Sequence, residues 1–214
     1  MKSYAVYLFD LDGTLTNTGP TWLGIFRDGL ADFGISGHSD TTLAAHTHDW
    51  KEVVNLGIPE ADIPTFIEAA YARANERLPL APLYEGAEEM LQTLKKAGKT
   101  IGIFTTMDRP ILEPVVARYK FDELFDVIVA GTDVEHRKPH PAGILHALEK
   151  LGKGTANAVY LGDKDTDILC GKNAGTDSIL FYPSDHQLMY DEKTLLASEP
   201  TFTIKHWREL TTNL

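Results

Sequence analysis

The stretch that decides the fold lies near the start of the chain and reads Tyr4-Ala5-Val6-Tyr7-Leu8-Phe9-Asp10-Leu11-Asp12-Gly13-Thr14. Its first six residues carry no charge, and such an unbroken apolar run predicts a strand buried on both faces. Residues i and i+2 point to the same side of an extended backbone, so we expect Asp10 and Asp12 to face one point beyond the strand. Gly13 permits a sharp turn there. Two carboxylates this close suit a hard cation such as Mg²⁺; an ordinary Asp-rich turn is the alternative.

From Tyr84 onward, the sequence alternates between amphipathic helical patterns and short apolar strands. Further strands are predicted at residues 100–104, 127–130, 158–161, 178–181 and 202–204. Helices are predicted at residues 85–97, 109–119, 141–151 and 165–174. This alternation indicates an α/β protein with a Rossmann-like parallel sheet and helices on both of its faces.

Residues 16–82 interrupt the alternation directly after the first strand. They contain three helical patterns and no strand candidate, and turn-forming residues cluster at both ends. We therefore expect an α/β core of residues 1–15 and 83–214, and a small all-helical domain of residues 16–82.

Polar residues follow the predicted strands, at the edge where a parallel sheet binds ligands. They are the pair Asp10 and Asp12, then Thr105 and Thr106, then Lys138, and finally Asp163 and Asp167. A threonine hydroxyl and a lysine can hold a phosphate group, and further carboxylates can complete an oxygen site for Mg²⁺. Each motif alone is also compatible with helix capping or a solvated lysine. Together they predict phosphoryl transfer with a carboxylate nucleophile and a second carboxylate as acid and base.

This pattern resembles the haloacid dehalogenase superfamily of phosphohydrolases along the whole chain. Residues 10–14 match its first motif, Thr105 its second, Lys138 with Pro139 its third, and residues 162–167 its fourth. The helical domain matches the family's α-helical cap in position and size. The resemblance implies that the enzyme works through an aspartyl-phosphate intermediate.

The resemblance also implies a role for each carboxylate. Asp10 would attack phosphorus, while Asp12 would protonate the leaving group and later activate water. Mg²⁺ would be held by Asp10, by the backbone carbonyl of Asp12 and by Asp163. Asp167 would contact the metal ligands rather than the metal itself. Thr105, Thr106 and Lys138 would bind phosphate.

The cap departs from phosphoglycolate phosphatase-like relatives, which usually carry a basic residue in the loop that dips into the site. The comparable stretch here, residues 44–50, offers His46, His48 and Trp50 but no arginine. We expect these three residues to influence substrate choice, with ordinary surface histidines as the alternative.

The composition excludes some functions. A formal net charge of −11 argues against nucleic-acid or membrane binding as the main activity. One cysteine, Cys170, allows no internal disulfide and suits the cytoplasm. Its apolar neighbours indicate a buried structural thiol. The apolar run at the N-terminus is short and interrupted by carboxylates, so we expect no signal peptide. We expect a monomer or a homodimer.

The leading hypothesis is a Mg²⁺-dependent phosphatase for a small phosphorylated metabolite, phosphoglycolate-like. A phosphosugar mutase or an inorganic pyrophosphatase of the same superfamily remains an alternative, because the motifs are shared. A phosphate-binding regulatory module without catalysis is the alternative from another class. The carboxylate set argues against a dehalogenase.

Overall fold

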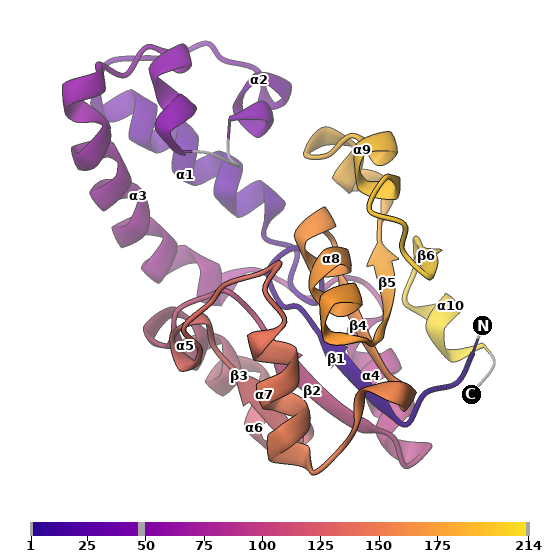
Figure 1. Cartoon of the computed structure of the whole chain (residues 1–214). Coiled ribbons are helices and arrows are strands. Elements are labelled where there is room, and N and C mark those ends of the chain that lie inside the picture. Colours follow the sequence, from indigo (N-terminus) through magenta and orange to yellow (C-terminus); the bar gives the residue numbers. More distant parts are fainter. Residues whose placement is uncertain (1, 47–49, 213–214) are drawn as a thin grey trace.

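Six parallel strands form a sheet in the computed structural model, which describes residues 2–46 and 50–212 (Figure 1). The order across the sheet is β3-β2-β1-β4-β5-β6. The prediction of a Rossmann-like parallel sheet is confirmed, although the first strand begins at Val6 rather than Tyr4. The strands are β1 (Val6–Phe9), β2 (Thr100–Phe104), β3 (Val127–Val129), β4 (Ala158–Gly162), β5 (Asp177–Phe181) and β6 (Phe202–Ile204).

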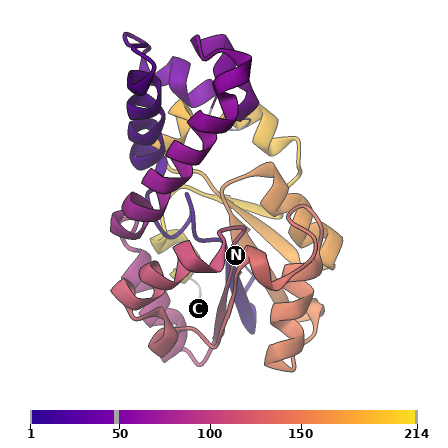
Figure 2. The same ribbon diagram turned by 90° about the vertical axis from the view of Figure 1, so that its left-hand side faces the viewer.

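Helices cover both faces of this sheet (Figure 2). Tyr7 and Phe9 of β1 pack into an apolar cluster with α4, α5 and α10, whereas Val6 and Leu8 pack into another with α7 and α8. Both faces of β1 are therefore shielded from solvent, which explains its unbroken apolar sequence. The helices of the core are α4 (Ala87–Lys96), α5 (Arg109–Tyr119), α6 (Phe121–Leu124), α7 (Ala142–Leu151), α8 (Asp165–Ala174), α9 (Glu192–Leu196) and α10 (Arg208–Thr211).

The position of β1 in the sheet determines where a ligand can bind. The chain moves from β1 to β2 and β3 on one side, and then crosses to β4 on the other side. The loops that leave β1 and β4 therefore diverge to opposite faces, and the crevice between them is the usual ligand site of such sheets. Both loops carry the predicted carboxylates.

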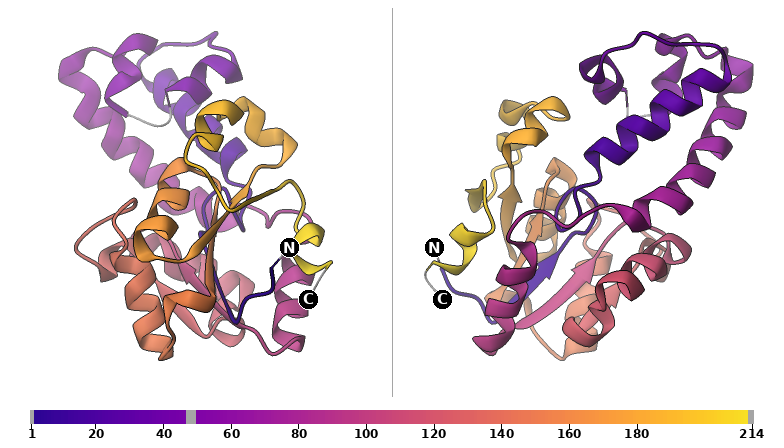
Figure 3. Two further views of the ribbon diagram at one scale, coloured as in Figure 1. Left: turned by 45° about the vertical axis from the view of Figure 1, so that its right-hand side comes forward. Right: turned by 180° about the vertical axis from the view of Figure 1, so that it is seen from behind.

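The helical segment stands above the carboxyl ends of the strands (Figure 3). It has an apolar core of its own, built around Phe26 and Phe66, as expected for a separate cap domain. Residues Trp50–Leu56, part of the second helical pattern, form a 3₁₀ helix. The elements of the cap are α1 (Gly19–Asp32), α2 (Asp40–Ala45), η1 (Trp50–Leu56), η2 (Glu60–Asp62), α3 (Ile63–Arg77) and η3 (Leu78–Leu80).

Two connections join the cap to the core, and they run side by side. The Asn17 amide donates to the Pro82 carbonyl at 2.7 Å, and the Tyr84 amide donates to the Leu15 carbonyl at 2.9 Å. We therefore propose the cap boundary at residues 16 and 82, with residues 1–15 and 83–214 as the core.

One segment of the core was not predicted from the sequence. Between β5 and β6, the chain forms the 3₁₀ helix η6 (Ser184–Leu188) and then α9. Met189 after η6 packs against the apolar core of the cap. These elements are too short to give a periodic pattern, yet they form a wall beside the site. Within residues 2–46 and 50–212, no helix combines the length and apolarity required to cross a membrane.

Two glycines of α1 allow a matched test of cap packing. A Cβ at Gly29 would lie 2.6 Å from the buried Phe66 ring, whereas the nearest atom to a Cβ at Gly24 is 3.9 Å away, on Arg77. We expect Gly29→Ala to lower the free energy of unfolding by about 1–3 kcal/mol through overpacking. Gly24→Ala should raise it by about 0.5–1 kcal/mol, because alanine favours a helix. Thermal unfolding followed by circular dichroism measures both, and equal shifts would contradict the close contact between α1 and α3.

Candidate active site

A cleft of about 740 Å³ opens above the carboxyl ends of β1 and β4, between the core and the cap. Its volume suits a small organic ligand. Asp12, Gly13, Thr106 and Asp163 contribute from the core. The cap and its connections contribute Asn17, Thr18, Gly19, Pro20, Trp22, Leu23, Trp50, Tyr71 and Leu78.

Asp10 is buried at the end of β1, where its amide donates to the Leu161 carbonyl of β4 at 2.7 Å. The Lys138 ammonium donates to Asp10 Oδ1 at 2.6 Å and to Asp167 Oδ1 at 2.8 Å. Only 5% of the Lys138 side chain is exposed, so this is a desolvated ion-pair triad rather than a surface contact. The triad joins segments that follow three different strands.

Asp163 and Asp167 are positioned by backbone contacts at the start of α8. Asp167 Oδ2 accepts the amide protons of Asp163 at 3.1 Å and Lys164 at 3.0 Å. Thr14 Oγ1 donates to Asp163 Oδ1 at 3.1 Å, which ties the first motif to the fourth. Gly13 has φ +82°, and a Cβ there would lie 2.6 Å from Asp163 Oδ2. Only glycine therefore fits this turn without displacing the carboxylate.

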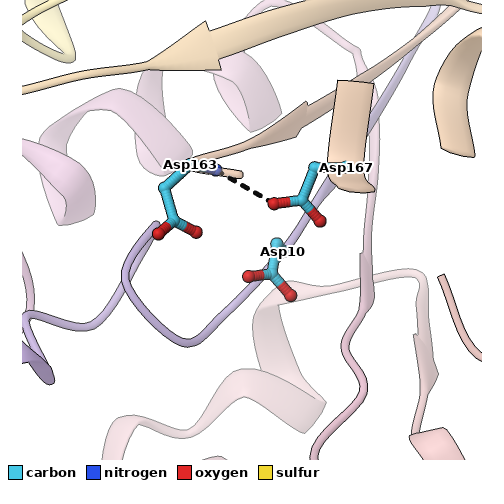
Figure 4. A group of neighbouring side chains, drawn as sticks. All are labelled: Asp10, Asp163 and Asp167. Atoms are coloured by element: carbon cyan, nitrogen blue, oxygen red, sulfur yellow. Dashed lines mark hydrogen bonds between the residues drawn. The ribbon is translucent and has the colours of Figure 1, made fainter. Parts of the chain in front are cut away.

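Three of these carboxylates can hold a metal ion together (Figure 4). One oxygen each from Asp10, Asp163 and Asp167 lies within 4.8 Å of the others, and all three residues are buried. Asp163 Oδ2 is buried, and a side-chain hydrogen bond with Tyr190 favours the ionised form of Asp163 against the larger opposing effect of burial. Such a carboxylate oxygen is a suitable ligand for a hard cation. The residues therefore fit a divalent metal.

The charges in this group shift one another's protonation. Burial raises the pKa of Asp10 to about 7, since the nearby Asp167 and Asp163 charges partly offset the opposing effect of Lys138. Burial raises the pKa of Asp163 to about 6. Burial alone would lower the pKa of Lys138, but Asp10 and Asp167 raise it, so the ammonium stays charged. Without a metal, the site therefore binds protons readily near neutral pH.

Asp12 lies apart from the buried triad and faces the cap. The Trp22 indole Nε1 of α1 lies 3.2 Å from Asp12 Oδ1 and 3.3 Å from Asp12 Oδ2, within donating distance of both. No sequence motif assigns Trp22 to the site, because its helical spacing alone indicates an apolar core position. The bond orients the carboxylate that borders the cleft.

The two predicted threonines have different surroundings. Thr105 is buried, and its Oγ1 accepts the Met107 amide proton at 3.2 Å. Thr106 lines the cleft. Both follow β2 at the same edge as Asp10, so their position suits phosphate binding, while the turn made by Thr105 is also structural.

Three cap residues were predicted to influence substrate choice, and one of them, Trp50, lines the cleft. His46 is not among the lining residues; its Nδ1 lies 2.8 Å from the Thr42 carbonyl and so caps α2. His48 lies outside the described residues.

The structure adds three lining residues that no sequence motif predicted, one before α4, one in η6 and one after η6. Tyr84, His186 and Tyr190 line the cleft, and the Tyr84 hydroxyl lies 2.7 Å from His186 Nε2. Burial lowers the pKa of His186 to about 4, so this imidazole is neutral at pH 7. No motif marks these residues, because Tyr84 meets His186 only when the chain after β5 folds back over the sheet edge.

Comparisons with known proteins identify the family of this chain. The family model for haloacid dehalogenase-like hydrolases matches residues 7–181. A pyrophosphatase PpaX from Bacillus cereus is 35% identical over 173 residues, which cover 79% of this chain and 79% of that protein.

Solved structures resemble the whole chain, cap included. A haloacid dehalogenase-like hydrolase from Bacteroides fragilis superimposes with a TM-score of 0.80 at 27% identity, over 97% of this chain and 100% of that one. The structure of a predicted phosphoglycolate phosphatase from Haemophilus somnus superimposes with a TM-score of 0.79 at 22% identity, over 98% of this chain and 97% of that one. At this identity the likeness supports the fold alone. The chain is therefore an enzyme of the haloacid dehalogenase-like hydrolase family.

Proposed function

We propose that this hydrolase is a Mg²⁺-dependent phosphatase that acts on a small phosphorylated metabolite in the cytoplasm through an aspartyl-phosphate intermediate. The observation that carries the proposal is the buried group of Asp10, Lys138, Asp163 and Asp167 beneath a cleft that Asp12 borders. This buried group combines a nucleophile, a cation and a carboxylate site for a metal away from bulk solvent.

Asp10 is the proposed nucleophile. One of its carboxylate oxygens attacks phosphorus, forming an Asp10 O–P bond while the bond from phosphorus to the ester oxygen breaks. Lys138 fixes the other carboxylate oxygen and adds a positive charge beside the transferring group. Mg²⁺, held by Asp10, the Asp12 carbonyl and Asp163, would offset the negative charge of the phosphate. Thr105 and Thr106 would bind phosphate oxygens, and Asp167 would position Lys138.

Asp12 is the proposed acid and base. It borders the cleft, where the leaving oxygen emerges, and gives that oxygen its proton. As a carboxylate it then takes a proton from the water that hydrolyses the aspartyl-phosphate. Trp22 limits the rotation of this carboxylate through the indole N–H.

Inorganic pyrophosphatase activity is the second candidate, because a relative at 35% identity is a pyrophosphatase PpaX. The same residues would break a phosphoanhydride with phosphate as the leaving group. A mutase or a silent phosphate-binding module remains an alternative from the shared motifs, and turnover with release of free phosphate separates the phosphatase from both.

We expect Asp10→Asn to lower the Mg²⁺-dependent hydrolysis of p-nitrophenyl phosphate by more than about a thousandfold, since an amide cannot form the aspartyl-phosphate. The melting temperature should stay the same or rise, because the change removes one of three clustered buried carboxylates. Steady-state kinetics and thermal unfolding measure the two effects. Asp40→Asn, on the exposed surface of the cap, is the matched control and should retain full activity. Substantial turnover by a clean Asp10→Asn preparation would contradict the assignment.

We expect Mg²⁺ affinity to fall as the pH decreases from 8 to 5. In the metal-free protein, Asp10 and Asp163 bind protons below about pH 7 and 6, and Mg²⁺ must displace them. The loss should approach about tenfold per pH unit for each displaced proton. Isothermal titration calorimetry of the metal-free enzyme measures it.

Two variants control the metal titration. Asp163→Asn should weaken Mg²⁺ binding and reduce its pH dependence, because one of the two titrating ligands is lost. Asp185→Asn changes a carboxylate that lines the cleft outside the metal group, so it should preserve the pH dependence. Mg²⁺ binding that is constant with pH, or that strengthens in acid, would contradict the proposed ligands.

A further inference from the structure

The wall of the cleft that faces Asp12 is aromatic. Trp22, Trp50 and Tyr71 line it from α1, η1 and α3. The Trp22 and Trp50 rings meet edge to face with centroids 5.7 Å apart, and the Trp50 and Tyr71 rings lie 4.7 Å apart. Tyr71 is 48% exposed, so this wall continues beyond the packed core of the cap to a surface that a ligand can reach.

Among the described residues of the cap, none of the four lysine and arginine side chains, Lys51 included, lines the cleft. The three arginines make ion pairs with cap carboxylates. The pairs are Arg27 with Asp40, Arg73 with Asp32, and Arg77 with Asp28.

The core side of the cleft is acidic. Among the described lining residues, the permanent cations are Arg137 and Lys164, and Arg137 is paired with Asp108 at 2.8 Å. Burial lowers the pKa of Lys164, but the neighbouring Asp163 and other carboxylates raise it more, so this ammonium stays charged where it lines the cleft. Six carboxylates line the cleft with these two cations, so a second anionic group on the substrate would meet a net negative lining. The carboxylates that line the cleft are Asp12, Asp108, Asp163, Asp165, Asp185 and Asp191.

The reaction geometry determines which part of the substrate meets the wall. The leaving oxygen must lie beside Asp12, which protonates it. Trp22 is bonded to that same carboxylate, so the first atoms beyond the ester oxygen enter next to the Trp22 ring. The rest of the leaving group then extends along Trp50 and Tyr71.

We propose that the preferred substrate is the phosphate monoester of an uncharged alcohol that carries a planar aromatic ring. This inference rests on the phosphatase function proposed above and narrows its substrate, away from phosphoglycolate and pyrophosphate. The ring packs against Trp50 and Tyr71, where aromatic contacts add to simple apolar burial. In the step itself, the Asp10 O–P bond forms, the ester P–O bond breaks, and the alcohol leaves with the proton of Asp12.

A panel of esters with similar alkoxide leaving groups tests the proposal. The wild-type enzyme with Mg²⁺ is assayed for phosphate release from benzyl phosphate, cyclohexylmethyl phosphate and phosphoglycolate, with pyrophosphate in parallel. We expect kcat/KM for benzyl phosphate to exceed that for phosphoglycolate and pyrophosphate by at least about tenfold. It should exceed that for cyclohexylmethyl phosphate by about two- to tenfold, the share that belongs to the flat ring.

Variants of Tyr71 connect the preference to the wall. Tyr71→Leu should lower the ratio of kcat/KM for benzyl phosphate to that for cyclohexylmethyl phosphate by several-fold, and Tyr71→Phe should retain the ratio. Tyr71 is half exposed, so its loss leaves the cap core intact. Phe33→Leu removes an aromatic ring of the cap that does not line the cleft and should leave the ratio unchanged.

The outcomes separate the substrate inference from the proposed function. If phosphoglycolate or pyrophosphate is hydrolysed best, the enzyme is a phosphatase or pyrophosphatase and the aromatic-ester inference is wrong. The same holds if Tyr71→Leu and Phe33→Leu change the ratio equally. If none of these compounds nor p-nitrophenyl phosphate releases phosphate, the proposed function itself fails.

Discussion

The bridge from Lys138 to Asp10 and Asp167 is the interaction on which the site depends. Three clustered carboxylates would be unfavourable in a dry environment, and the buried ammonium offsets part of their repulsion. Loss of the Lys138 charge would leave the clustered carboxylates uncompensated, and breaking buried ion pairs in this way typically costs about 3–5 kcal/mol. The bridge also joins segments that follow β1, β3 and β4, so the charge balance and the alignment of these loops are coupled.

The sheet makes this arrangement available. Because helices cover both faces of β1, its carboxyl end is the place where the strand meets polar groups. The order of the strands then brings the loop after β1 beside the loop after β4. The cap has its own apolar core, and it contributes Trp22 and other residues to the lining of the cleft. The residues of the proposed chemistry therefore lie in the core, while the cap and the segment after β5 line much of the cleft above them.

Charge explains why the site requires a metal for its proposed chemistry. Asp10, Asp163 and Asp167 outnumber the cation that bridges two of them, and the chain as a whole carries a net charge of −11. A phosphate dianion entering this place would be repelled, and a divalent cation on the carboxylates reverses the local sign. The carboxylates that line the rest of the cleft also repel anions, so they disfavour a second anionic group on the substrate.

The sequence by itself determined the parallel sheet, the helical insertion and the order of the motifs, because apolar periodicity and strand ends are local properties. It predicted that Asp10, Lys138 and Asp163 would meet, since parallel strands end at one edge. It could not determine which groups bond there: Lys138 and Asp10 are 128 residues apart, and their contact depends on strand order and burial. Tertiary structure alone placed Trp22 on Asp12, left His46 capping α2, and brought the segment after β5 over the cleft. Such contacts join elements that lie far apart in the chain, so no local spacing encodes them.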